Sequence, residues 1–321
     1  MTPGFLLLAL LVIGASAIAL YQLFLYSPPE FLGQDLVPKR SVTLEGNNGT
    51  ADTSHLSEQS SIPPLRLAIA PVISPEESIQ VYEGFVDYLA RKLKRRPVML
   101  QRETYAETNE LVRYGRCDAA LICTYAFVRG ELEFDMQILA IPVIDGAITY
   151  HSLIVVPKTS EAVSLLDLEG RRFASADIIS TSGWLYPAIW LQERGIDANQ
   201  FFLEHLISGS HDRSIRAVAH GYVDGAAVDS LVYEQVVSKD SSILETTKVI
   251  QKSPPYGMPP LVVSPEVDPA LREELLSVLL SMHEDGAGRK VLTSLTLDRF
   301  VVPDNTLYDD IREGVRIWES P

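Results

Sequence analysis

Three hydroxyl residues followed by a glycine, Ser180-Thr181-Ser182-Gly183, have the types and spacing of an anion-binding loop. They follow a short apolar run and precede residues 184–191, whose spacing is that of a helix. The first N–H groups of a helix lack intrahelical partners, and the helix dipole adds partial positive charge there. Hydroxyls can donate further hydrogen bonds to an anion. The same residues would also serve as an ordinary N-cap, so the motif alone leaves both interpretations open.

Charge and cysteine usage exclude several classes of function. The 321-residue chain has 42 acidic and 27 basic residues and a net charge of -15, which disfavours nucleic acid as a partner. Local N–H and hydroxyl donors can still hold a small anion. Cys117 and Cys123 flank a predicted strand and would lie about 20 Å apart, too far for a disulfide, so we expect buried thiols. Without a Cys-x-x-Cys motif or clustered histidines, we expect neither a metal nor a cofactor.

The N-terminal part of the chain has the character of a membrane segment. Residues 5–26 contain no charged side chain, and a helix of this length can cross a bilayer. No Lys or Arg precedes them, and a possible Ala-Ser-Ala cleavage site lies inside the apolar run. We expect residues 1–26 to be an uncleaved transmembrane anchor, with a cleaved signal segment as the alternative. Residues 27–64 are polar and lack a hydrophobic period, which predicts a flexible linker.

The next part of the chain alternates strands and helices. The predicted elements are a strand at 65–70, a helix from 76, a strand at 98–100, a helix at 107–114 and a strand at 117–123. This order predicts a parallel sheet with right-handed crossovers. Ligands bind beyond the carboxyl ends of strands in such sheets, and Thr124 and Tyr125 follow the third strand.

A second alternating series follows one long predicted strand. Its elements are the strand at 148–156, the hydroxyl motif, a strand at 201–207, a helix at 212–220, a strand at 225–228, a helix at 230–237 and a strand at 246–251. The chain then returns through 261–263, with helices at 269–282 and 307–318. This predicts an α/β fold of two lobes joined by two crossover strands, with 65–150 plus 258–321 as one lobe and 151–257 as the other.

Several motifs occur in an order that resembles a known family. They are Tyr82 ahead of Phe85-Val86-Asp87-Tyr88-Leu89, Gly115-Arg116-Cys117-Asp118-Ala119-Ala120 before Thr124-Tyr125, Ser164-Leu165-Leu166-Asp167-Leu168-Glu169-Gly170, Ser180-Thr181-Ser182-Gly183 before Pro187, Gly209-Ser210-His211-Asp212, and 221–229. Together they resemble the PhnD-like phosphate-, phosphite- and phosphonate-type substrate-binding proteins of ABC transporters. That resemblance implies the type 2 periplasmic binding-protein fold.

The resemblance also implies a ligand site. It would consist of Ser180, Thr181 and Ser182 holding an oxyanion, His211 donating to the same group, Tyr82, Thr124 and Tyr125 facing it across a cleft, and Asp229 receiving a ligand proton or an amine. Four of these residues, His211, Tyr82, Tyr125 and Asp229, have a plainer interpretation as well. His211 and Asp229 could cap helices, and the tyrosines could pack in a core.

One departure from the family bears on the ligand. Where well-studied members carry an acid, this chain has Met258-Pro259. An aminoalkyl group would therefore lose a partner, which argues against 2-aminoethylphosphonate. Phosphate, phosphite, methylphosphonate and other small oxyanions stay open.

The expected function is that of an extracytoplasmic solute-binding protein. It would be periplasmic, anchored to the inner membrane by its N-terminal helix, and would deliver a phosphorus oxyanion to an ABC transporter permease. The alternative is the same fold acting as a sensor for a membrane kinase or receptor. We expect no enzymatic activity, because the sequence has no Gly-x-Ser-x-Gly elbow and no Walker loop.

Overall fold

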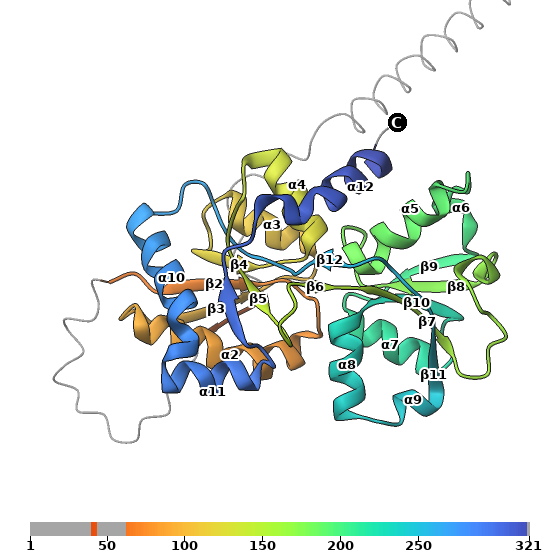
Figure 1. The fold of residues 1–321 in the computed structure, drawn as a ribbon, viewed down its shortest axis with the longest axis horizontal. Coiled ribbons are helices and arrows are strands. Elements are labelled where there is room, and N and C mark those ends of the chain that lie inside the picture. The colour runs from red at the N-terminus through yellow and green to blue at the C-terminus, as the bar shows by residue number, and fades with distance from the viewer. Residues whose placement is uncertain (1–39, 44–61, 320–321) are drawn as a thin grey trace, which may run out of the picture. The chain divides into compact units, whose positions relative to one another are not determined.

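The computed structural model describes residues 40–43 and 62–319 (Figure 1). The predicted anchor, residues 1–26, lies outside the described residues, as does most of the predicted linker. The segment expected to be a linker nevertheless contains a strand, β1 (Arg40–Thr43), which pairs antiparallel with β3 (Pro97–Gln101). β-branched residues favour such an edge strand. Within the described part of the chain, no helix combines the length and apolarity needed to span a bilayer.

Within the described residues, seven strands form a first, mixed sheet in the order β1-β3-β2-β4-β13-β5-β14. The remaining members are β2 (Leu65–Ile69), β4 (Ala119–Leu121), β5 (Gln137–Val143), β13 (Leu261–Val263) and β14 (Arg299–Val301). Strands β3, β2 and β4 are parallel, which confirms the predicted first series. The returning strand β13 enters antiparallel between β4 and β5.

The helices of this first lobe cover both faces of its sheet. They are α2 (Pro75–Lys92), α3 (Tyr105–Arg113), α4 (Thr124–Phe134), α10 (Pro269–Ser281), η5 (Met282–Glu284) and α11 (Gly286–Ser294). Alternate residues of β2 point to opposite faces, as the pleat requires. Leu67 and Ile69 pack in the core that contains α2 and α10, whereas Ala68 and Ala70 pack in the core that contains α3 and α4.

A second sheet has, in the same part of the chain, five strands in the order β11-β7-β10-β8-β9. They are β7 (Ser152–Pro157), β8 (Arg172–Ser175), β9 (Glu204–Ile207), β10 (Gly225–Asp229) and β11 (Thr247–Lys252). This second lobe also contains η3 (Leu165–Leu168), η4 (Thr181–Leu185), α5 (Tyr186–Gln192), α6 (Ala198–Phe201), α7 (His211–Ala219), α8 (Ser230–Lys239) and α9 (Ile243–Thr246). Strands β8, β9 and β10 are parallel.

The strand predicted at 201–207 begins later than the sequence indicates. Phe201 ends the short helix α6, and only residues from Glu204 join the sheet. Phe202 instead stacks on Phe173, with ring centroids 4.2 Å apart. An apolar run of this length cannot by itself distinguish a strand from a helix end packed in a core.

Two short strands connect the lobes. β6 (Thr149–Tyr150) and β12 (Tyr256–Gly257) pair with each other as a ribbon. The single long strand predicted at 148–156 is therefore interrupted at His151, whose N–H donates to Ser230 and whose Nδ1 lies 2.9 Å from the carbonyl oxygen of Ser253. The division of the chain at 150/151 and 257/258 stays a prediction.

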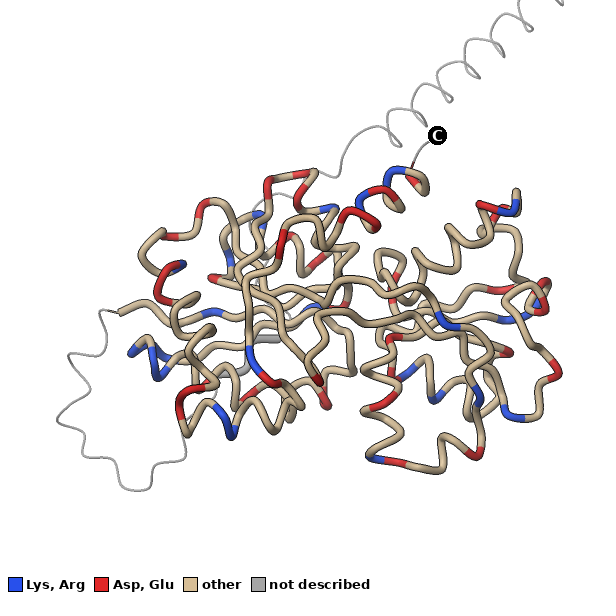
Figure 2. The backbone as a smooth tube through the Cα atoms, viewed as in Figure 1, with Lys and Arg blue, Asp and Glu red and all other residues tan. Residues whose placement is uncertain are grey.

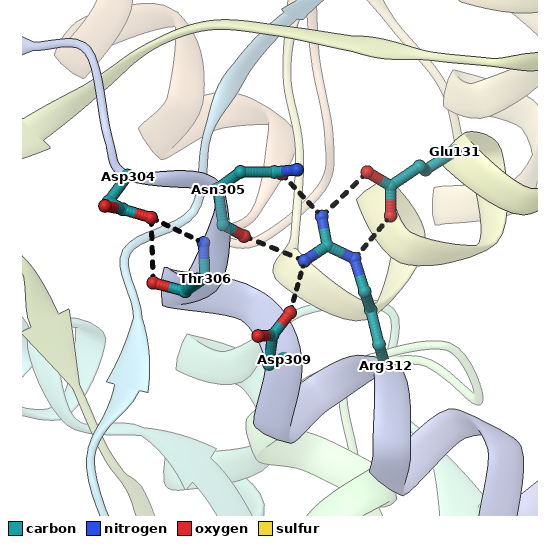
Figure 3. A network of polar contacts seen from close by, with 6 residues as sticks. All are labelled: Glu131, Asp304, Asn305, Thr306, Asp309 and Arg312. Carbon is teal, nitrogen blue, oxygen red and sulfur yellow. Dashed lines mark hydrogen bonds and ion pairs between the residues drawn. The ribbon is translucent and has the colours of Figure 1, made fainter.

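The C-terminal helix contacts both lobes. The chain leaves β14 through η6 (Asn305–Tyr308) and forms α12 (Asp309–Glu319), which lies beside α4 (Figure 1). Near its end Trp318 meets Trp184 of the second lobe edge-on, with ring centroids 6.1 Å apart. Arg312 fixes the helix to α4 through two hydrogen bonds to the carboxylate of Glu131, at 2.7 and 2.8 Å (Figure 3).

Charged residues are distributed over both lobes. Lys and Arg positions are interspersed with Asp and Glu positions along the described backbone (Figure 2). Mixed charge of this kind supports solubility but gives little long-range attraction for an anion. Any preference for an anion must therefore arise from groups within a site.

We expect Arg312→Ala to lower the free energy of unfolding by about 1–3 kcal/mol, because it leaves the half-buried Glu131 carboxylate without its bidentate partner. The matched control is Arg316→Ala on the same helix, where the arginine is exposed and pairs with Glu313. That variant should change stability by less than about 0.5 kcal/mol. Urea unfolding measures both, and equal effects would contradict the role given to Arg312.

Candidate anion-binding site

The hydroxyl motif forms a tight π-helical turn at the start of a helix. Residues 181–185 form η4, which continues directly into α5. Ser180 caps this turn, since its Oγ accepts the N–H of Gly183 at 3.0 Å. A Cβ at Gly183 would lie 2.9 Å from that same Oγ, so the turn requires glycine here. The capping interpretation is confirmed, and it leaves the neighbouring hydroxyls available for other contacts.

The three hydroxyls of the motif have different partners. Thr181 Oγ1 accepts the N–H of Tyr125 at 2.7 Å and so reaches the first lobe. The Sγ of Cys123 lies 3.5 Å from the same oxygen. Ser182 is buried, and its Oγ has no hydrogen-bond partner among the described residues. Of the three, Ser182 therefore has the hydroxyl with the greatest need for a ligand acceptor.

His211 lies against the motif from a neighbouring helix. Its Nδ1 accepts the N–H of Asp229 at 3.2 Å, and its Nε2 lies 3.4 Å from Ser180 Oγ. Burial lowers the pKa of His211 to about 3, with Asp212 opposing the shift. The ring is therefore neutral and carries its proton on Nε2, directed at Ser180. The family resemblance implied a direct donation to the ligand, which stays a prediction; in this geometry His211 contacts the serine that caps η4.

Asp229 is a buried carboxyl that faces the first lobe. Its Oδ1 caps α8 by accepting the N–H groups of Leu231 and Val232. Burial raises the pKa of Asp229 to about 7, although these two N–H groups oppose the shift. Burial, and then the charge of Asp229, raise the pKa of Tyr82 to about 12, which places these two residues near each other across the cleft.

The two residues predicted after β4 point in different directions. Thr124 is buried, and its hydroxyl donates to the carbonyl oxygen of Gly257 at 3.0 Å. Tyr125 contributes its backbone N–H to Thr181, but its hydroxyl donates to Glu319 of α12 at 2.6 Å. The structure therefore turns the Tyr125 side chain toward the C-terminal helix instead of presenting it to a ligand, because α12 supplies a carboxylate on that side.

Several further hydroxyls are buried without partners, and sequence reasoning did not single them out. Among the described residues, the hydroxyls of Ser78, Tyr105 and Ser210 accompany Ser182 in having no hydrogen-bond partner, and each residue is at most 1% exposed. An unmade buried hydrogen bond costs about 1–3 kcal/mol. Such a group of donors is explained if a bound acceptor completes it.

The missed hydroxyls share the kind of position that identified the serine motif. Ser78 lies in the first turn of α2, Tyr105 is the first residue of α3, and Ser210 occupies the N-cap position of α7 without a side-chain cap. Burial raises the pKa of both Tyr105 and Tyr150, and the charge of Asp229 adds to the shift. A search for hydroxyls at the start of every predicted helix would have found most of this set.

Backbone N–H groups of each lobe donate hydrogen bonds to acceptors of the other lobe. Asp212 accepts the N–H of Ser74 at 2.8 Å, and Asp177 accepts the N–H of Tyr105 at 3.0 Å. In the opposite sense, the N–H of His211 donates to a carbonyl oxygen of the first lobe at 2.9 Å. The lobes are thus closed on each other at the hydroxyl cluster.

The arrangement favours binding over catalysis. His211 cannot accept the Ser180 proton, because its Nδ1 is occupied and its Nε2 carries a proton. Within the described residues, no group of His, Cys, Asp or Glu is arranged to hold a metal ion. Neutral donors can exchange hydrogen bonds with an anion without any covalent step.

The comparisons with known proteins assign the family. The family model described as ABC transporter, phosphonate, periplasmic substrate-binding protein matches residues 67–308. The chain belongs to this family. Phosphonate-type binding proteins of this kind are extracytoplasmic, and the PhnD-like resemblance of the sequence is confirmed.

Individual relatives agree with this family. Phosphate-import protein PhnD of Mycolicibacterium smegmatis is 26% identical over 200 residues, which are 59% of this chain and 62% of that protein. This phosphonate-family chain therefore covers about six tenths of that relative's length.

Solved structures agree on the fold. The binding protein component of an ABC phosphonate transporter from Pseudomonas aeruginosa has a TM-score of 0.74 and 24% identity, covering 78% of this chain and 85% of that one. PhnD1 from Prochlorococcus marinus, in complex with methylphosphonate, has a TM-score of 0.71 and 22% identity, covering 78% of this chain and 97% of that one. These likenesses confirm the type 2 periplasmic binding-protein fold for the phosphonate-family chain.

The buried carboxyl of this phosphonate-family protein predicts a dependence of stability on pH. The folded pKa of Asp229 is about 7, above the value of about 3.9 in an unfolded chain, so the folded state binds the extra proton. The wild-type protein should therefore lose stability relative to Asp229→Asn as pH rises from about 4 to about 7, by roughly 1.4 kcal/mol per pH unit, with no further change above. Urea unfolding of both ligand-free proteins at pH 5, 6, 7 and 8 measures this. A constant difference would contradict it.

Proposed function

We propose that this chain captures a small phosphorus oxyanion reversibly between its two lobes and delivers it to an ABC transporter permease. The single observation that carries the proposal is the buried Ser182 hydroxyl, unpartnered among the described residues at the N-terminal turn of η4. Serine hydroxyls and first-turn N–H groups are suitable donors for a phosphonate, phosphite or phosphate. Family membership favours delivery to a transporter over signalling to a sensor kinase.

Both lobes would supply groups to the bound oxyanion. The second lobe offers Ser182 and Ser210, and the first lobe offers Ser78 and Tyr105. Ser180 and Thr181 would hold the turn in place, through Gly183 and Tyr125 respectively. Closing the lobes removes water from the anion, which strengthens each of these hydrogen bonds.

Asp229 would select an oxyanion that carries or shares a proton. A buried carboxylate beside a fully ionised anion is repelled by it, but a carboxyl with a pKa of about 7 can hold a proton between them. Phosphorus oxyanions titrate in this range, since a phosphate ester has its second pKa near about 6. Sulfate is fully ionised there and brings no proton, so it should bind more weakly.

The permease partner and the membrane anchor are parts of the same proposal. An N-terminal helix at residues 1–26 would hold the binding lobes close to the permease at the outer face of the inner membrane. Ligand exchange would need no enzymatic step, only opening and closing of the lobes about the ribbon of β6 and β12.

Ser182→Ala should weaken binding of the phosphorus oxyanion about 10- to 150-fold, the effect of losing one charge-assisted hydrogen bond of about 1.5–3 kcal/mol. The ligand-free variant should be at least as stable as wild type, because the change removes a buried hydroxyl without a partner in the described structure. Calorimetric titration with phosphate, phosphite and methylphosphonate measures the first effect, and thermal unfolding measures the second.

The matched control is Ser264→Ala. Ser264 is also buried, but its hydroxyl accepts the N–H of Glu266. It follows the central strand β13, which is antiparallel to β4, and so lies at the end of the sheet opposite to Thr124. This variant should bind like wild type. Unchanged binding by Ser182→Ala, or no binding of any phosphorus oxyanion by wild type, would contradict the proposed function.

A further inference from the structure

A cavity of about 290 Å³ lies between helix α2 of the first lobe and helix α8 of the second. Its lining is largely apolar and includes Val72, Ile73, Val81, Phe85, Ile122 and Met258. An apolar space of this size inside a ligand cleft favours a hydrocarbon group, because the group and the cavity walls both lose contact with water when it binds.

The cavity is connected to the Ser180 turn through Asp229 and His211. Asp229 and Tyr82 both line it, and the N–H of Asp229 donates to His211, whose ring contacts Ser180. Val72 lines it too, and its carbonyl oxygen accepts the N–H of His211. A ligand whose anionic group is held by the hydroxyls would therefore extend past Asp229 into the apolar space.

The charged groups around the cavity leave little to attract a second charged group, although Gln235, Ser238, Ser294 and Thr296 add uncharged polar side chains to the lining. Among the described residues that line it, Asp229 and Lys239 are the charged ones. Lys239 forms an ion pair with Glu77 across the lobes. The cation at the outer end is thus already paired, so a ligand with a terminal carboxylate gains little there.

A primary amine on the ligand would be poorly satisfied. An ammonium group donates three hydrogen bonds, and burying one without enough acceptors is costly. Asp229 Oδ1 already accepts two N–H groups of α8, which leaves Oδ2 as the carboxylate atom available to a ligand. The adjoining Val232, Ile73 and Met258 side chains offer hydrocarbon or thioether surface instead.

The volume sets the size of the group that fits. An apolar cavity of about 150 Å³ holds a benzene molecule, so about 290 Å³ has room for a phenyl group or a chain of about four to six carbons. We propose that this cavity receives a neutral hydrocarbon substituent on phosphorus, which makes an alkyl- or arylphosphonate the preferred ligand. The inference rests on the proposed function, because the hydroxyl cluster must hold the phosphonate group.

Calorimetric titration of the full-length protein with a homologous series tests this. The probes are phosphite, methyl-, ethyl-, propyl- and butylphosphonate, phenylphosphonate, and 2-aminoethylphosphonate as the charged isostere of the propyl compound. Affinity should rise about fourfold per added methylene up to the butyl compound. Propylphosphonate should bind at least about tenfold more tightly than 2-aminoethylphosphonate.

Two outcomes would overturn the inference and are distinguishable from failure of the proposed function. If phosphite and methylphosphonate bind but longer chains bind no better, the cavity is not a substituent site while the oxyanion site stands. Tighter binding of 2-aminoethylphosphonate than of propylphosphonate would likewise reject it. If no phosphorus oxyanion binds at all, the proposed function fails and this inference fails with it.

A pair of valine variants locates the substituent. Val81 lies on α2 and lines the cavity, so Val81→Phe should fill part of it and reduce the affinity ratio of butylphosphonate to phosphite at least about tenfold. The control is Val237→Phe, a half-buried helical valine on α8 that is not part of the lining. It should leave the ratio unchanged. An unchanged ratio in Val81→Phe, with the protein folded by circular dichroism, would place the substituent elsewhere and overturn the inference.

Discussion

The N-termini of helices from the two lobes face each other. Each lobe supplies hydrogen-bond acceptors for backbone N–H groups at the starts of helices in the other lobe. Asp212 and Thr181 of the second lobe accept N–H groups at the starts of α2 and α4, and Asp177 does the same for α3. In the first lobe, the carbonyl oxygen of Val72 accepts the N–H of His211 at the start of α7. Because unpaired helix-end donors are costly when buried, these bonds hold the lobes together and water must replace them on opening.

The same closure buries hydroxyls that no protein group in the described structure satisfies. The backbone donors find acceptors across the cleft, whereas Ser182, Tyr105 and Ser210 do not. A ligand acceptor would offset this cost, so binding and closure are coupled in free energy. With His211 neutral and Asp229 near the midpoint of its titration, the site would hold an anion mainly with neutral dipoles. Such a site suits reversible capture, because no strong fixed charge has to be separated on release.

Local signals in the sequence were sufficient for much of the fold. The apolar run of β2 and the helical spacing of α2 each predict their own element, α3 was predicted two residues late at 107–114, and the parallel first series follows from their order. The position of the Ser180 motif was equally readable, because its cap lies within the motif. Helix α4 was missed, since its N-cap residue, Cys123, makes no side-chain cap and the accepting hydroxyl is Thr181, 56 residues from Tyr125.

The sequence by itself determined most of the element types, the family and the presence of a hydroxyl-rich turn, because these depend on local periodicity, capping and composition. The tertiary structure decided which hydroxyls are free. Ser180 and Thr181 are engaged, Ser182 is not, and Tyr125 turns to Glu319 because α12 packs against α4. It also decided that Asp229 is buried beside an apolar cavity. Burial and partner choice depend on contacts between residues distant in the chain, which no local pattern encodes.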